Sequence, residues 1–274
     1  MAALPVIMLM GPTASGKTAL ALDLVEQFPC DIISVDSALV YRGLDVGSAK
    51  PTRAEQAKAP HRLIDICEPT ESYSAGQFRE DCFAAIKDIH AQGRIPLLVG
   101  GTMLYYRALS QLDDLPSTDE LLRRQLSEKL EQEGLDALVA ELQQRDPNGA
   151  ERVELQNPQR VLRALEMVTM TGKSLTELWQ GKKSQALPWP VLKLVVAPDR
   201  ELLHERIALR LTQMFENGFV DEVRGLYERG DLHEGLPAIR AVGYRQVWQA
   251  LDGQHDLEKA QELALYATSQ LAKR

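Results

Sequence analysis

Short apolar runs alternate with amphipathic stretches in the first part of the chain. Four of these runs predict buried strands, at residues 5–10, 31–35, 62–66 and 95–99. Between them, residues 17–27 and 75–90 carry apolar side chains at helical spacing, and Ser74 with Gln77 predicts a capping box at the second helix. Strands that alternate with helices in this way favour a parallel, doubly wound α/β sheet.

The pattern changes at about residue 116. Leucines recur at helical spacing from Leu121 to Leu142, and a second helical pattern follows Pro158. A strand-like run returns only at 191–196 and predicts the last strand of the sheet. We therefore expect a first core segment at 1–115, an all-helical insertion at 116–190, and a second core segment with C-terminal helices at 191–274.

Composition limits the function classes that fit this chain. Its 274 residues suffice for an α/β domain with an insertion, and no run approaches the roughly 18 apolar residues of a membrane span. The first residues lack the features of a secretory signal, so we expect a cytoplasmic protein. The three cysteines lack metal-ligand spacing and indicate reduced thiols. A net charge of −8 argues against general polyanion binding, although residues 152–183 allow a local basic face.

The strongest chemical signal directly follows the first predicted strand. It consists of Gly11, Pro12, Thr13, Ala14, Ser15, Gly16, Lys17 and Thr18, which form a P-loop motif. Glycines at both ends let the backbone wrap around an anion, so that amide groups and the start of the next helix point at phosphate oxygens. We expect Lys17 to reach the outer phosphate and Thr18 to bind Mg²⁺.

A carboxylate and a threonine are predicted to reach the same edge of the sheet. Asp36 follows the second strand and Thr102 follows the fourth, and ligands bind at the carboxyl ends of parallel strands. From spacing alone, two roles for Asp36 remain open. It could hold Mg²⁺ through water, as in a kinase or ATPase, or act as general base on a nucleophile that attacks a carbon bearing a diphosphate.

Two arginines stand four residues apart in the helix predicted after Asp199. Arg206 and Arg210 therefore share one helix face and could converge on one anion. The alternative is that they pair with the neighbouring glutamates of the same helix.

Six segments, in order along the chain, resemble the tRNA dimethylallyltransferases of bacteria. They are 11–18 (GPTASGKT), 36–51 (DSALVYRGLDVGSAKP), 60–66 (PHRLIDI), 99–105 (VGGTMLY), 157–166 (NPQRVLRALE) and 242–246 (VGYRQ). These enzymes attach an isopentenyl group to N6 of adenine 37, beside the anticodon. The resemblance implies a P-loop NTPase-like sheet with a helical insertion. It also implies that the P-loop grips the diphosphate of dimethylallyl diphosphate.

The resemblance further implies roles for individual residues. Asp36 would be the catalytic general base, Thr102 an active-site threonine and Arg210 a diphosphate ligand, with Mg²⁺ as cofactor. The implied contacts to tRNA are Asp36, Ser37, Ala38, Leu39, Thr102, Arg124, Gln159, Arg160, Val161, Leu162, Arg163, Ala164, Arg240, Val242, Gly243, Tyr244 and Arg245. The partners would be dimethylallyl diphosphate and a tRNA anticodon stem-loop, with no membrane, and we expect a monomer.

The chain departs from the family pattern at two places. Ser48 stands where relatives usually have threonine, and Ser269 where they commonly have arginine; relatives also continue into a Lys-Arg-Gln-x-x-Trp segment, so we expect a truncated C-terminus. Two other functions remain as alternatives. One is a small-molecule kinase that uses the same phosphate loop, and the other is an RNA-binding module whose P-loop no longer acts.

Overall fold

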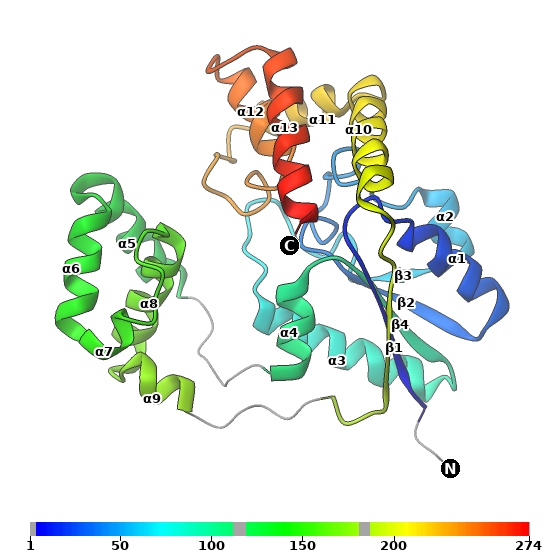
Figure 1. Ribbon diagram of the computed structural model, residues 1–274, viewed down its shortest axis with the longest axis horizontal. Helices are drawn as coiled ribbons and strands as arrows, with labels where there is room; N and C mark the ends of the chain where they lie inside the picture. The colour runs from blue at the N-terminus through cyan, green and yellow to red at the C-terminus, as the bar shows by residue number, and fades with distance from the viewer. Residues whose placement is uncertain (1–3, 112–118, 181–186, 274) are drawn as a thin grey trace. The chain divides into compact units, whose positions relative to one another are not determined.

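The computed structural model of the protein describes residues 4–111, 119–180 and 187–273 (Figure 1). The chain divides into two compact units, Met1–Tyr106 with Leu187–Arg274, and Arg107–Ala186. The boundary expected between residues 115 and 116 lies outside the described residues. Within the described ranges, no helix is both long and apolar enough to cross a membrane.

A parallel sheet forms the centre of the first unit. Its strands are β1 (Val6–Met10), β2 (Cys30–Val35), β3 (His61–Arg62), β4 (Ile95–Gly100) and β5 (Val191–Val195). In the described residues they are arranged in the order β3-β2-β4-β1-β5, and each adjacent pair is parallel. The predicted α/β class is therefore confirmed, as are the strands expected near residues 5–10, 31–35, 95–99 and 191–196.

The strand predicted at residues 62–66 is wrong in its extent. Only His61 and Arg62 pair with β2, and the chain then turns, because Leu63 and Asp65 adopt left-handed backbone conformations with φ of 62° and 55°. The amides of Asp65 and Ile66 instead donate to the carbonyls of Leu39 and Val40, at 3.1 and 2.9 Å. This segment therefore supports the loop that follows β2 and does not extend the sheet.

Helices cover both faces of the sheet. They include α1 (Lys17–Gln27), α2 (Arg53–Lys58), α3 (Ala75–Ala91) and α4 (Met103–Gln111). The buried Ala21 of α1 packs with Ile32 and Leu97, which lie on one face, while α3 contacts β2 and β4 from the other side (Figure 1). The predicted capping box at the start of α3 is present.

Three strands of the sheet end at the same level. In the strand register, Gly100 at the end of β4 is paired with Met10 of β1 on one side and with Val35 of β2 on the other. A side chain at Gly100 would collide with the backbone, since its Cβ would lie 2.0 Å from the Val35 carbonyl oxygen. The residues that follow these strands are consequently held close together at one edge.

Four helices complete the first unit: α10 (Arg200–Glu216), α11 (Phe219–Tyr227), α12 (Tyr244–Leu251) and α13 (Leu257–Ala272). Their apolar faces form a core with Val40, Tyr41 and Leu44, which belong to the loop after β2. The C-terminal helices therefore pack directly on the loop that carries part of the sheet edge.

The second unit consists of helices and short connections, with no strand in its described residues. It contains α5 (Glu120–Glu133), α6 (Leu135–Arg145), α7 (Pro147–Ala150), α8 (Pro158–Thr171) and α9 (Leu175–Gln180). Leu138, Leu142 and Leu165 are among the residues of its own apolar core. The Asn157 side chain accepts hydrogen bonds from the amides of Gln159 and Arg160 and caps α8.

Candidate active site

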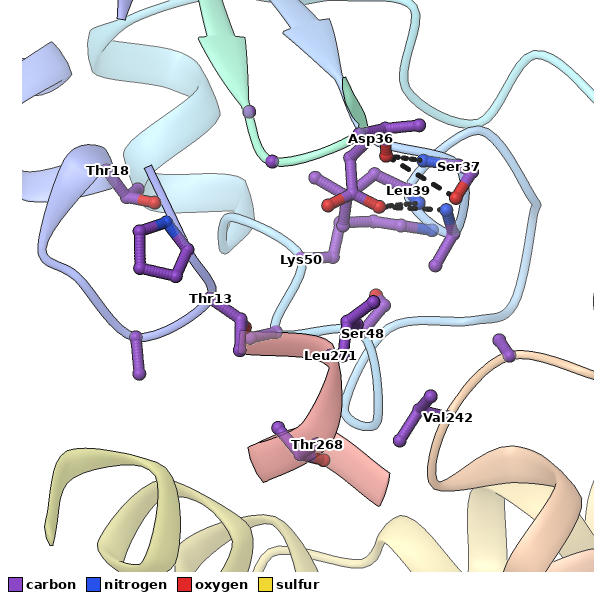
Figure 2. A pocket seen from close by; sticks show the side chains of 18 of the residues that line it. Thr13, Thr18, Asp36, Ser37, Leu39, Ser48, Lys50, Val242, Thr268 and Leu271 are labelled. Carbon is purple, nitrogen blue, oxygen red and sulfur yellow. Dashed lines mark hydrogen bonds between the residues drawn. The ribbon is translucent and has the colours of Figure 1, made fainter. Parts of the chain in front are cut away.

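A cavity of about 1500 Å³ lies at the carboxyl edge of the sheet in the first unit. Its wall comes from segments that are far apart in the sequence: the P-loop at 11–18, residues 36–39, 47–51 and 100–105, helix α10, residues 240–245 and the end of α13. In Figure 2, Thr13, Asp36, Ser48 and Leu271 reach this space from four of these segments. The volume exceeds that of typical small-molecule sites, so the cavity has room for more than one reactant group.

The P-loop has the backbone of an anion-binding turn. Gly16 precedes α1 in a left-handed conformation, with φ of 96°, and Ala14 shares this rare geometry, with φ of 60°. Gly11 passes so close to the end of β5 that a Cβ there would lie 2.4 Å from the Val196 carbonyl oxygen. These residues direct the loop around the start of α1, whose free amides and dipole favour an anion.

Lys17 is partly buried against the loop that precedes it. Its Nζ donates to the Pro12 carbonyl oxygen at 2.5 Å and to Ser15 Oγ at 3.3 Å. Burial lowers the pKa of Lys17 to about 8, an effect that Asp36 opposes and Arg210 reinforces. A bound anion would favour the charged form of this amine, so ligand binding and protonation of Lys17 are expected to be coupled.

The two arginines of α10 turn toward the P-loop and not toward glutamates of their own helix. Arg210 donates to the Thr13 hydroxyl, and Arg206 donates to the Ser15 carbonyl oxygen at 3.4 Å. Burial lowers the pKa of Arg210 from its usual value, and the charge of Asp36 opposes this change. Of the two alternatives, this geometry favours a position beside the phosphate loop over pairing with the glutamates of α10, and convergence on one anion stays a prediction.

Asp36 stands at the end of β2 and faces the same space (Figure 2). Its Oδ1 accepts hydrogen bonds from the amides of Ala38 at 2.8 Å and Leu39 at 3.4 Å. Within the described part of the chain, no group donates a hydrogen bond to Oδ2. One oxygen therefore fixes the carboxylate, while the second is left to act on a bound molecule.

Thr102 connects the ends of β2 and β4. Its amide donates to the Val35 carbonyl oxygen at 3.2 Å, and its Oγ1 accepts a hydrogen bond from the Ser37 amide at 3.1 Å. The threonine hydroxyl is consequently held beside the segment that carries Asp36. As the sequence predicted, the P-loop, Asp36 and Thr102 all border one cavity.

The residues around the P-loop fit a magnesium ion that takes most of its ligands from phosphate oxygens and water. Among the described residues there is no cluster of three or more histidine, cysteine or acidic side chains that would hold a metal by itself. Mg²⁺ commonly binds one or two protein oxygens together with phosphate oxygens and water. Thr18 and Asp36, which border the same cavity, supply oxygens of that kind.

Part of the set expected to contact RNA borders this cavity. It comprises Asp36, Ser37, Ala38, Leu39, Thr102, Arg240, Val242, Gly243, Tyr244 and Arg245. Arg240 and Arg245 are exposed, whereas the Tyr244 side chain is fully buried. The expectation that the Tyr244 side chain touches RNA needs correction, because its ring packs in the core against Phe219.

The rest of the set lies in the second unit. Arg124, Gln159 and Arg160 are exposed and Arg163 is partly exposed. The side chains of Val161, Leu162 and Ala164 are instead buried in the core of this unit, so they pack α8 and do not face solvent. The expectation of RNA contact is corrected for these three side chains. Lys182 and Lys183, which belong to the basic stretch at 152–183, lie outside the described residues.

The structure adds a buried carboxylate in the second unit that sequence reasoning missed. Glu166 is fully buried, and its Oε2 lies 3.1 Å from Arg163 and 3.4 Å from Arg123. Arg123 also donates to the Gln159 side chain at 2.6 Å. The helical spacing of Arg163 and Glu166 was a local signal for their contact, whereas the contact with Arg123 of another helix was not visible in the sequence.

A second carboxylate supports the loop beside the cavity. Glu222 of α11 accepts hydrogen bonds from the amides of Asp45, Val46 and Gly47, at 3.0, 2.7 and 3.1 Å. The Tyr244 hydroxyl donates to the same carboxylate at 2.6 Å. This arrangement, which we call the Glu222 clamp, holds the start of the loop that brings residues 47–51 to the cavity.

The fold and the site together define a phosphate-binding α/β protein of the P-loop class, with a carboxylate beside the phosphate loop. A family model described as IPP transferase matches residues 39–274, and the chain belongs to this family. It is therefore an enzyme of the tRNA prenyl-transferring group.

Solved structures agree with this membership. The chain is 35% identical to the full-length tRNA isopentenylpyrophosphate transferase of Bacillus halodurans, covering 98% of this chain and 84% of that one with a TM-score of 0.68. It is 33% identical to the tRNA isopentenylpyrophosphate transferase of Staphylococcus epidermidis, covering 98% and 88% with a TM-score of 0.67. It is 29% identical to a eukaryotic dimethylallyltransferase that acts on tRNA. This match covers 99% of this chain and 68% of that one, with a TM-score of 0.82.

Proposed function

We propose that this enzyme transfers the dimethylallyl group of dimethylallyl diphosphate to N6 of adenine 37 in a tRNA anticodon loop. The observation that carries the proposal is that Asp36 borders the same cavity as the phosphate loop, Lys17 and Arg210. A base and an anion site in one cavity are what an alkyl transfer from a diphosphate requires.

In the proposed reaction, the C–N bond forms as the bond between the allylic carbon and the diphosphate oxygen breaks. The adenine amine is a weak nucleophile, because its lone pair is delocalised into the ring. Asp36 accepts its proton as the new bond forms, and the electron pair of the broken C–O bond leaves with the diphosphate. The pocket also keeps water from the allylic carbon.

The leaving group needs positive charge where its own charge grows. Lys17, Arg210 and the amides at the start of α1 surround the position at which we place the diphosphate. Mg²⁺, held by Thr18 and the diphosphate, would supply further charge when it is bound. Thr102 orients the acceptor amine near Asp36.

The acceptor base reaches the cavity by leaving its stack, which costs only a few kcal/mol in an anticodon loop because its bases are unpaired. We assign Arg240 and Arg245 at the cavity, and Arg124, Gln159, Arg160 and Arg163 in the second unit, to phosphate and base-edge contacts with the tRNA. We place the activity in the cytoplasm, where tRNA is found. We also propose that the enzyme acts as a monomer.

The test is transfer of label from radioactive dimethylallyl diphosphate to an anticodon stem-loop RNA in the presence of Mg²⁺. We expect labelled RNA with the unaltered chain and none with Lys17→Ala. Consumption of ATP without prenyl transfer would point to a kinase. RNA binding and function that survive Lys17→Ala would point to an RNA-binding module.

A further inference from the structure

Ser34 is a buried polar residue that no part of the proposed reaction uses. It is 2% exposed, and its Oγ has no hydrogen-bond partner within the described residues. It also borders the cavity that contains the P-loop and Asp36. A buried hydroxyl without a partner destabilises a protein by about 1–3 kcal/mol, so its presence here calls for an explanation.

The strand geometry places Ser34 beneath the start of α1. Side chains alternate along β2, so Ser34 shares a face with Cys30 and Ile32, which pack with Ala21 of α1. Ala21 and Thr18, on the first turns of that helix, border the same cavity as Ser34. The hydroxyl is therefore on the side of the sheet where the P-loop delivers its phosphate-binding groups.

Packing does not explain a hydroxyl at this position. Alanine would leave almost the same apolar surface in place and would bury no unpaired polar atom. A hydroxyl becomes favourable only when an oxygen or nitrogen in the cavity accepts its proton or donates to it. The oxygens expected next to Thr18 and Lys17 are those of a diphosphate and of water molecules bound to its metal ion.

We propose that Ser34 is a ligand-positioning residue whose hydroxyl hydrogen-bonds an oxygen of the Mg²⁺–diphosphate group, either a phosphate oxygen or a metal-bound water. This inference rests on the proposed function, because it requires a diphosphate in the P-loop. It adds a contact from the floor of the cavity to those made by the P-loop and α10. The contact would hold the leaving group from the side of β2, next to Asp36.

The first experiment measures binding of inorganic pyrophosphate by titration calorimetry, to the unaltered chain and to Ser34→Ala. Each is titrated once with Mg²⁺ and once with EDTA. We expect Ser34→Ala to weaken binding roughly tenfold, the effect of losing one hydrogen bond to a charged group. A loss in both conditions identifies a phosphate oxygen as the partner, and a loss with Mg²⁺ alone identifies a metal-bound water. Equal affinities in both conditions would overturn the inference.

The second experiment compares thermal stability without and with the ligand. Without pyrophosphate, Ser34→Ala should melt at the same temperature as the unaltered chain or above it, since the substitution removes an unpaired buried group. The rise in melting temperature on adding Mg²⁺ and pyrophosphate should be smaller in the variant. Lower stability without ligand, combined with an unchanged ligand-induced rise, would show a purely structural serine and overturn the inference.

Two further variants make the outcome specific. Ser34→Cys nearly keeps the volume but offers only a weak hydrogen bond, so its affinity should also fall. Ser74→Ala removes a hydroxyl that accepts a hydrogen bond from the Gln77 amide at the start of α3 and does not border the cavity, so pyrophosphate affinity should be unchanged. If the unaltered chain fails to bind pyrophosphate, the proposed function and this inference both fall. If it binds and Ser34→Ala binds equally well, only the inference falls.

Discussion

Asp36 is the residue on which the proposed proton transfer depends. Asn at this position keeps an oxygen that can accept from the amides of Ala38 and Leu39, so the loop should hold its shape. Without a base, we expect Asp36→Asn to lower the single-turnover rate of prenyl transfer by roughly 10²–10⁴. Affinities for pyrophosphate and for RNA should stay within experimental error. If pyrophosphate binding with Mg²⁺ is lost instead, Asp36 serves the metal and not the amine.

The lowered pKa of Lys17 leads us to expect that diphosphate binding depends on pH. Its pKa in the folded protein is lowered to about 8 by burial, so it loses its proton over a range in which an exposed lysine would still be charged. A diphosphate prefers the charged form and must therefore raise this pKa. Binding should take up protons near pH 8, and affinity should weaken as pH rises through that value.

The measurement is calorimetry of pyrophosphate binding in two buffers with different ionisation enthalpies, from pH 7 to pH 9.5. Lys17→Arg is the control, because arginine stays charged throughout this range. The ligand's own ionisation affects both proteins equally, so the difference between them isolates Lys17. Identical pH profiles for the two proteins would contradict the assignment.

The same group affects folding stability without ligand, and the direction follows from proton counting. Between about pH 8 and the pKa that Lys17 has in the unfolded chain, Lys17 binds more protons in the unfolded chain than in the folded one. Burial of charged Lys17 thus lowers the stability of the folded protein below pH 8, and this destabilisation becomes smaller as the pH rises. Charged Lys17 is tolerated at neutral pH because its role is to bind an anion.

At the scale of elements, the Glu222 clamp ties α11 and α12 to the loop that enters the cavity. Tyr244→Phe removes one donor and leaves the three backbone amides on the carboxylate. Glu222→Gln turns one oxygen into an amide donor, which then faces groups that also donate. We therefore expect a moderate loss of stability for Tyr244→Phe and a larger loss for Glu222→Gln.

Thermal unfolding tests this order, and steady-state kinetics tests its link to function. Because residues 47–51 border the cavity, loosening the loop should raise KM for dimethylallyl diphosphate more than it lowers kcat. The reverse order of the two variants in stability would contradict the clamp. An unchanged KM in both variants would show that the Glu222 clamp does not affect substrate binding.

The elements that could be predicted from sequence are those specified by local pattern. Strand alternation, the glycines of the P-loop and the capping box at Ser74 each depend on residues close together in the chain, and each appears in the structure. The prediction of a strand at residues 62–66 was wrong because tertiary contacts determine the backbone conformation of this segment. Lys50, whose side chain is 4% exposed, binds the carboxylate of Asp65 at 2.5 Å, where the backbone is left-handed.

The candidate site could likewise be predicted only in part from the sequence. Asp36 and Thr102 were identifiable because parallel strands end at one edge, a rule that needs no coordinates. The Glu222 clamp was not, because the three amides that it holds lie more than a hundred residues away along the chain. Tyr244 was misread for a related reason: a tyrosine in a recognised motif gives no sign of whether its hydroxyl faces solvent or a buried carboxylate.

At the scale of the whole molecule, charge raises a question about RNA binding. The chain carries a formal net charge of −8, so its average field repels a polyanion. Attraction must come from local groups, and α8 shows two kinds of arginine. Arg160 forms an exposed ion pair with Glu154 at 2.8 Å, whereas Arg163 lies beside the fully buried Glu166.

These two environments predict different outcomes for two substitutions on one helix. An exposed ion pair contributes at most about 1 kcal/mol, so Arg160 can exchange Glu154 for a phosphate at little cost. Arg160→Ala should leave the melting temperature unchanged, weaken binding of an anticodon stem-loop, and reduce the slope of log affinity against log salt by about 1. Arg163→Ala should lower the melting temperature, because it removes a positive partner from a buried carboxylate.

Glu154→Gln supplies the matched control, with the opposite sign. It releases Arg160 from its carboxylate and removes a negative charge near the RNA, so stem-loop affinity should rise while pyrophosphate affinity stays the same. Fluorescence anisotropy at several salt concentrations measures the first effect, and calorimetry measures the second. If Arg160→Ala and Glu154→Gln both leave stem-loop affinity unchanged, RNA does not contact this face of α8. The attraction that overcomes the net negative charge would then have to come from other basic groups, with Arg240 and Arg245 at the cavity as the next pair to substitute.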